Sequence, residues 1–157
     1  MKKFLLIGDV VDSRSQDTKK LWKKFNKVIN KSHKEVPCVY PAQITLGDEF
    51  QAVVEGEVQG LELSKWIQEQ MKPFSMRFVM VAFYGDLALV KKVPSHYNPL
   101  NTPEMMLAQK LMKQLKKEKK KWHFQKFVKQ STREKYLTLC ALDYTDPSSF
   151  EIFENNP

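Results

Sequence analysis

The sequence predicts an α+β fold, in which a sheet carries helices packed mainly on one face. Two observations predict it. Segments of strand character and segments of helical period follow one another in the order strand, helix, hairpin, helix, strand, helix, strand. The chain has 157 residues, of which 42% are apolar and 28% charged, enough to bury one core and too few for two. We therefore expect a single domain over residues 1–157.

The first two elements are a buried strand and an amphipathic helix. Residues 2–8 are continuously apolar after the lysines, which is typical of a central strand covered on both sides. From Thr18, helical spacing relates Leu21, Phe25, Val28, Ile29 and Ser32. The helix should end before Val36-Pro37, because a residue that precedes proline disfavours helical dihedrals. Its N-cap candidates are Asp12, Ser13, Ser15 and Asp17.

A hairpin and a second helix follow. Residues 41–46 and 49–54 read as two short strands around Gly47-Asp48, which suits a two-residue type II′ turn with Asp48 at the tip. Residues 57–71 have helical period and are closed by Pro73, and residues 76–84 form a strongly apolar strand.

The last third of the chain is less regular. Residues 91–102 are rich in proline and asparagine and predict a long loop. Thr102-Pro103 then resembles an N-cap followed by proline at the first helical position, and Ala108, Leu111 and Leu115 share one face of the helix that it opens. Residues 122–128 and 135–142 predict two final strands.

The charge of +8 is concentrated in two lysine-rich segments. They contain Lys19, Lys20, Lys23, Lys24, Lys27, Lys31 and Lys34, and Lys110, Lys113, Lys116, Lys117, Lys119, Lys120 and Lys121. Such segments either bind nucleic acid or form solvated helix faces, and lysine alone does not decide between the two.

The composition also indicates the cellular compartment of the protein. No segment approaches the roughly 18 apolar residues of a membrane span, and the apolar run after the first lysines is too short for a secretory signal. Cys38 and Cys140 are far apart in the sequence and lack metal-ligand spacing. We expect a cytoplasmic protein without a membrane partner.

Two carboxylates carry the most specific hypothesis about function. Asp9 follows the first strand and Asp48 marks the hairpin tip, and these two elements should be neighbours in the sheet. Adjacent carboxylates repel unless a cation joins them, and hard oxygen ligands favour Mg²⁺ or Mn²⁺. Asp12 or Glu49 would complete the set, although Asp12 also suits an N-cap and both Gly-Asp pairs also suit turns.

Phosphate is the second ligand that this region predicts. Ser13 and Arg14 precede the first helix, whose N-terminal amides attract anions. Arg14 is equally compatible with a solvated surface position.

The stretches FLLIGDVVDSR and ITLGDEFQAVV together resemble the SatD family, an uncharacterised bacterial group. Weaker likeness continues to about Lys117. The same pair is similar to the palm-like core of class III nucleotide cyclases and GGDEF domains, in which the first strand and the hairpin tip supply metal-binding acids. The resemblance places Asp9 and Asp48 as ligands, with Glu49 at the following acid.

This resemblance implies a ferredoxin-like or palm-like domain that binds a nucleoside triphosphate through a divalent metal. If the protein is an enzyme, the reaction would be nucleotidyl or phosphoryl transfer, as in a cyclase. Because such cyclases build their site across a dimer, the resemblance also implies a homodimer. The alternative is a catalytically silent regulatory module whose lysine faces bind nucleic acid or an acidic partner.

Overall fold

The computed structural model describes residues 2–15, 17–45, 47–85 and 102–140. The elements are β1 (Lys3–Val10), the 3₁₀ helix η1 (Ser13–Ser15), α1 (Thr18–Glu35), β2 (Tyr40–Ile44), β3 (Glu49–Glu55), α2 (Glu57–Met71), β4 (Met76–Phe83), α4 (Pro103–Glu118), β5 (Trp122–Gln125) and α5 (Gln130–Cys140). None of the helices in these ranges combines the length and the apolar content that a membrane crossing requires.

The five strands form one mixed sheet in the order β2-β3-β1-β4-β5. β1 lies in the middle, as its continuous apolar run predicted, and pairs antiparallel with β3 and with β4. β2 extends the sheet antiparallel to β3, and β5 extends it parallel to β4. The fold class is therefore α+β, with a sheet whose central strand is flanked by neighbours of opposite direction.

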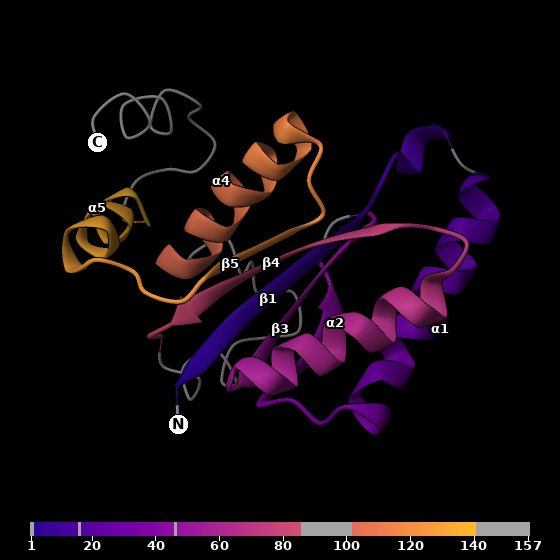
Figure 1. Cartoon of the computed structure of the whole chain (residues 1–157), viewed down its shortest axis with the longest axis horizontal. Helices are drawn as coiled ribbons and strands as arrows, with labels where there is room; N and C mark the ends of the chain where they lie inside the picture. The colour runs from indigo at the N-terminus through magenta and orange to yellow at the C-terminus, as the bar shows by residue number, and fades with distance from the viewer. Residues whose placement is uncertain (1, 16, 46, 86–101, 141–157) are drawn as a thin grey trace.

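Helices cover both faces of this sheet (Figure 1). On the first face, Phe4 and Leu6 of β1 join a core with Phe25 of α1 and Leu63 of α2. On the second face, the intervening residues of β1 pack against α4, whose buried residues include Met112. The prediction of helices mainly on one face is therefore wrong. The apolar runs of β1 and of β4 after Arg77 are continuous because both sides of these strands are buried.

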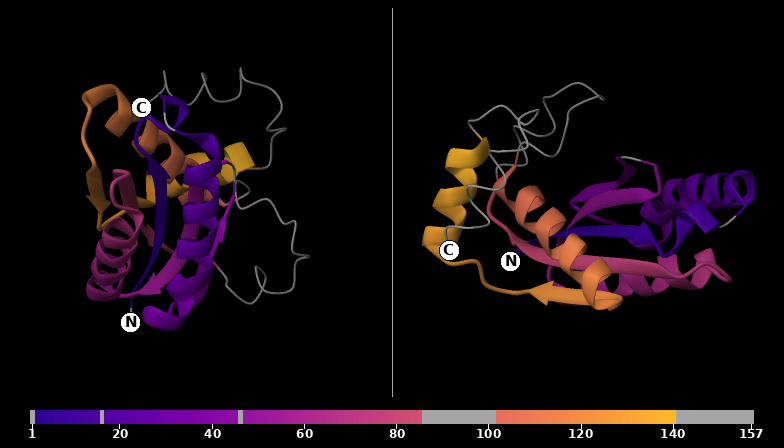
Figure 2. Two further views of the ribbon diagram at one scale, coloured as in Figure 1. Left: turned by 90° about the vertical axis from the view of Figure 1, so that its right-hand side faces the viewer. Right: turned by 90° about the horizontal axis from the view of Figure 1, so that it is seen from above.

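Helix α5 and β5 correct the expected end of the chain. Residues 135–142 were expected to form a strand, but Lys135 to Cys140 belong to α5, and the expected strand 122–128 is shortened to β5. A short apolar run does not by itself distinguish strand from helix. Here the helix begins earlier, at Gln130, whose side chain bonds Glu134 one turn later at 3.0 Å. It packs against α4, at the opposite end of the molecule from α1 (Figure 2).

The connection into α4 follows the sequence prediction where it is described. Thr102 is the N-cap, and its hydroxyl accepts a hydrogen bond from the backbone N–H of Met105 at 3.2 Å. Pro103 occupies the first helical position. Residues 91–101 of the predicted loop lie outside the described residues.

Strand β1 extends further than its sequence indicated. It runs through Gly8 and Asp9 to Val10, so Gly8-Asp9 is not a turn. A Cβ atom at Gly8 would meet the rings of Phe50 and Phe78, which pack edge to face with centroids 6.2 Å apart. Gly8 is therefore required by packing on the first face, while Asp9 points to the second.

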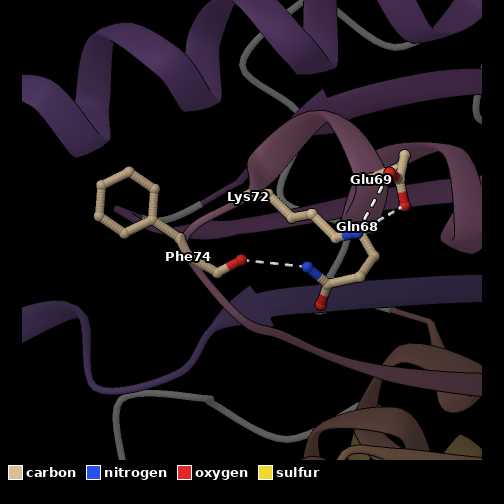
Figure 3. A network of polar contacts seen from close by, with 4 residues as sticks. All are labelled: Gln68, Glu69, Lys72 and Phe74. Carbon is tan, nitrogen blue, oxygen red and sulfur yellow. Dashed lines mark hydrogen bonds and ion pairs between the residues drawn. The ribbon is translucent and has the colours of Figure 1, made fainter.

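A side-chain bracket holds the turn between α2 and β4. Gln68 donates a hydrogen bond to the carbonyl of Phe74 at 3.0 Å and accepts one from the N–H of Met76 at 2.8 Å. Figure 3 shows the first of these bonds beside the ion pair between Lys72 and Glu69, whose closest atoms are 3.1 Å apart. These two bonds position Met76, the first residue of β4, and therefore also Arg77, the residue that follows it.

Candidate functional site

A polar pocket of about 560 Å³ opens where β1 ends. It gathers most of the residues that the sequence singled out, because the end of β1, the hairpin loop, η1, the start of β4 and the last turns of α4 meet there. Its lining residues are Asp9, Val10, Asp12, Ser13, Arg14, Ser15, Asp48, Arg77 and Lys116.

Asp9 is the most buried polar residue of the pocket, with 2% of its surface exposed. Its Oδ2 lies 2.7 Å from Nζ of Lys116, and its Oδ1 lies 3.5 Å from Nη1 of Arg77. Oδ1 is buried and accepts no hydrogen bond from any described residue. A buried carboxylate oxygen without a hydrogen bond is costly, so this atom is available to a ligand that brings positive charge.

Burial raises the pKa of Asp9 above its ordinary value. The hydrogen bond and charge of Lys116 and the charge of Arg77 act in the opposite direction, whereas the nearby charge of Asp48 raises the pKa further. Desolvation outweighs the two cations, so ionised Asp9 is held at a cost in the ligand-free protein.

Asp48 reaches the pocket from the hairpin. Its backbone carbonyl accepts a hydrogen bond from the N–H of Val10 at 3.3 Å, which ties the hairpin to the end of β1. β2 ends at Ile44, two residues before the expected end of that strand, and Leu46 of the connection lies outside the described residues. Gly47 has a φ of 51°, a left-handed conformation that favours glycine.

Glu49 lies beside the pocket and is not one of its lining residues. It pairs with Asp9 across β3 and β1, and Nε2 of Gln109 on α4 donates a hydrogen bond to its Oε1. Burial raises the pKa of Glu49 to about 7; Gln109 opposes the shift, while Asp9 increases it. This placement makes Glu49 a half-buried neighbour of Asp9 under α4.

The segment before α1 differs from the expectation. Asp17 is the N-cap of α1 and accepts hydrogen bonds from two backbone N–H groups of the first turn. Ser13 and Arg14 therefore lie in η1, ahead of the helix N-terminus rather than beside its amides. Asp12 is not an N-cap: it is exposed, has a φ of 52°, and its carbonyl accepts the Ser15 hydroxyl at 2.8 Å.

Sequence reasoning missed the two cations that contact Asp9. Arg77 is the one charged residue of the apolar strand β4, which was a usable signal, and the register Asp9↔Arg77 places it beside Asp9. Nothing in the sequence distinguished Lys116 from the other lysines at the end of α4. It lies seven residues, two helical turns, after Gln109, so both project from the same side of α4 toward the acids.

The acids of the pocket could supply only some of the ligands that a metal ion needs. Within the described ranges, no three His, Cys, Asp or Glu side chains form a group that can hold a metal ion. Mg²⁺, however, is commonly bound by one or two carboxylates together with substrate phosphates. Asp9, through the Oδ1 that accepts no hydrogen bond, and Asp48 are the residues that would hold it.

Comparison with known protein families identifies the part of this chain that a family shares. A family model of the SatD family matches residues 4–93, more than half of the chain. The matched segment contains Asp9, Asp48 and Arg77, while Gln109 and Lys116 come from α4 beyond it. No curated protein matches the chain. The chain belongs to the SatD family.

Proposed function

We propose that the pocket binds the phosphate groups of a nucleoside triphosphate together with Mg²⁺ or Mn²⁺. The observation that carries this proposal is the joining of three carboxylates with three cations in one pocket at the end of β1; the acids are Asp9, Asp12 and Asp48, and the cations are Arg14, Arg77 and Lys116. A pocket that holds both signs suits a ligand that brings both signs, which a metal–triphosphate complex does.

The strand order supports the finer likeness to palm-like enzymes. The first six main elements follow the order β-α-β-β-α-β, and β1 lies antiparallel between β3 and β4. The same order of elements is typical of ferredoxin-like folds, which supports this likeness. It brings the end of the first strand beside the hairpin, where cyclases of this shape carry their metal-binding acids. A palm-like fold of this kind is therefore part of the proposed function.

The cations of the pocket would contact phosphate. Arg14 and Arg77 offer planar donors for phosphate oxygens, and the hydroxyl of Ser13 adds a neutral donor. The side chain of Lys116 is 48% exposed, so its ammonium can leave Asp9 and follow a phosphate without crossing the core. A bound metal would supply neutralisation of phosphate charge and activation of an attacking hydroxyl, which is the chemistry of nucleotidyl or phosphoryl transfer.

The proposal is tested by thermal unfolding with ATP, GTP, CTP and UTP, each with and without Mn²⁺. A ligand that binds only the folded state at 100 times its Kd adds about 2.7 kcal/mol, which corresponds to roughly 5–10 °C in a domain of this size. We expect the shift to require both nucleotide and metal, and to disappear in Asp48→Asn. The matched control is Glu55→Gln, which removes an acid from the other end of β3.

A second candidate is an anion site that works without metal. It is favoured by the contact between Lys116 and Asp9, which already neutralises the buried acid. In that case a nucleotide or inorganic triphosphate would raise the melting temperature equally with EDTA and with Mn²⁺, and Asp48→Asn would strengthen binding by removing a negative charge. No shift with any of these ligands would exclude both functions.

A further inference from the structure

The outer side of α1 carries a stripe of lysines that the proposed pocket does not use. Six of them are exposed along the helix: Lys19, Lys20, Lys23, Lys27, Lys31 and Lys34. The buried side of the same helix is formed by Leu21, Phe25, Val28, Ile29 and Ser32. The lysines recur at spacings of one, three and four residues, so they lie together on the face turned away from the core.

This stripe is almost free of compensating charge. Within α1 the acid is Glu35, at its last position, and Asp17 caps its beginning. Among the described residues, none of the six lysines forms an ion pair with a carboxylate. Lysines four residues apart on a helix repel each other, so the stripe lowers helix stability. A polyanion bound along it would remove that repulsion.

The dimensions of the stripe match a nucleic-acid strand. Lys19 to Lys34 span about 22 Å at the 1.5 Å rise of an α-helix. At roughly 3.4 Å per phosphate of a stacked strand, about 22 Å corresponds to about six phosphates, one for each exposed lysine.

An aromatic side chain and three polar side chains border the stripe. Trp22 is 40% exposed on the outer surface of α1, although large apolar side chains usually lie in the core. Asn26 follows one turn later and donates to the Trp22 carbonyl at 2.9 Å; Asn30 and His33 are also exposed. An indole beside lysines offers a stacking surface for an unpaired base.

We propose that the outer face of α1 binds single-stranded nucleic acid, with the lysines on consecutive phosphates and Trp22 stacked on a base. A bilayer is a poorer occupant, because the apolar side of α1 is buried in the core and cannot insert. A duplex is also poorer, because its bases are already stacked and paired. This binding is independent of the carboxylate pocket and requires no metal.

The test measures fluorescence anisotropy of labelled oligo-dT and oligo-U, 12 nucleotides long, from 50 to 400 mM salt in EDTA. The variant is the triple Lys23→Glu, Lys27→Glu, Lys31→Glu. The matched control is Lys110→Glu, Lys113→Glu, Lys117→Glu on α4, which changes the net charge equally at three exposed positions under the sheet's other face. Circular dichroism and melting temperature verify that both triples fold.

We expect wild type to bind with a steep salt dependence. The α1 triple should lose at least 100-fold in affinity at 100 mM salt and about 2 units of the slope of log K against log salt, whereas the α4 triple should lose much less. Trp22→Ala should weaken binding about 10-fold. Asp9→Asn should bind as wild type does, which separates this face from the proposed nucleotide site.

Several results would overturn the inference. They are no binding at 50 mM salt, equal losses in the two triples, or a duplex of the same length bound as tightly as the single strand with Trp22→Ala unchanged. Stronger α1-dependent binding to polyglutamate or to phosphatidylserine vesicles would assign the face to an acidic polypeptide or a membrane surface instead.

Discussion

Helices α1 and α4 both carry long runs of lysines, but different residues lie beneath them. Beneath α1 the sheet is apolar, and its exposed lysines face solvent without a carboxylate partner among the described residues. Beneath the end of α4 the sheet contributes Asp9 and Glu49. Lys116 of α4 contacts Asp9, and Gln109 of α4 contacts Glu49. The role of a lysine on a helix is therefore decided by the strand residue that it meets, and not by the number of lysines around it.

The largest effects should come from the apolar side of each helix. Phe25→Ala on α1 and Met112→Ala on α4 each empty a buried position, and we expect losses of about 3–5 and about 2–5 kcal/mol in the free energy of unfolding. Urea denaturation measures both. A loss under 0.5 kcal/mol for Met112→Ala would contradict the packing of α4 on the second face.

A smaller effect should follow from pH at the acids under α4. The pKa of Glu49 is raised from 4.5 to about 7, so the folded protein holds a proton that the unfolded chain releases. The free energy of unfolding should therefore fall as pH rises from about 4.5 to about 7. Glu49→Gln should remove this loss and stabilise the protein at pH 8 by about 1–3 kcal/mol, with little change at pH 4.

Denaturation at a series of pH values checks this prediction. Part of the dependence should persist in Glu49→Gln, because the pKa of Asp9 is raised as well. Equal slopes for wild type and Glu49→Gln would show that Glu49 is not buried against Asp9.

The ion pair of Lys116 should have a modest effect. Lys116→Met leaves Asp9 with Arg77 alone and should cost about 1 kcal/mol at pH 8, a value reduced because the lysine is half exposed. Lys113→Met, one turn earlier and exposed, is the control and should stay within about 0.5 kcal/mol of wild type. Equal losses of stability for the two substitutions would contradict a specific contribution of the ion pair between Lys116 and Asp9.

The smallest effect should be a gain on α1. Lys27→Glu places an acid four residues from both Lys23 and Lys31, which replaces two repulsions with two attractions. We expect about 0.5–1 kcal/mol of added stability at low salt, disappearing in 1 M NaCl. Thermal unfolding at the two salt concentrations measures it, and a gain that persists in 1 M NaCl would point to a cause other than charge.

The sequence predicted the elements whose local signals agree with their environment. The helical period of α1, the helix at residues 57–71 and the cap at Thr102 were all recognisable, because each depends on neighbours within a few residues. Helix α5 was missed because its position depends on α4: Arg133 reaches the buried Glu104, with Nε and Oε1 3.6 Å apart. Such a contact has no signature in a window of eight residues.

The same distinction applies to the candidate site. Asp9 and Asp48 could be brought together from the sequence, because a strand and the following hairpin are natural neighbours in a sheet. Arg77 needed the register of β4, and Lys116 needed the side of the sheet on which α4 packs. Because helices were expected mainly on one face, α4 was not expected on the second face. Lys116, the cation closest to Asp9, was therefore not recognised.

The position of Lys116 in the chain also affects how the protein is made. β1, β3 and β4 are complete once residue 83 has been synthesised, whereas Lys116 is added later, after about 2–7 s at 5–20 residues per second. In any folding intermediate that forms before α4 is available, the sheet would hold Asp9 and Glu49 together without Lys116, and its second apolar face would be uncovered. The docking of α4 would cover that face and bring Lys116 to Asp9 in one step, before β5 and α5 are added.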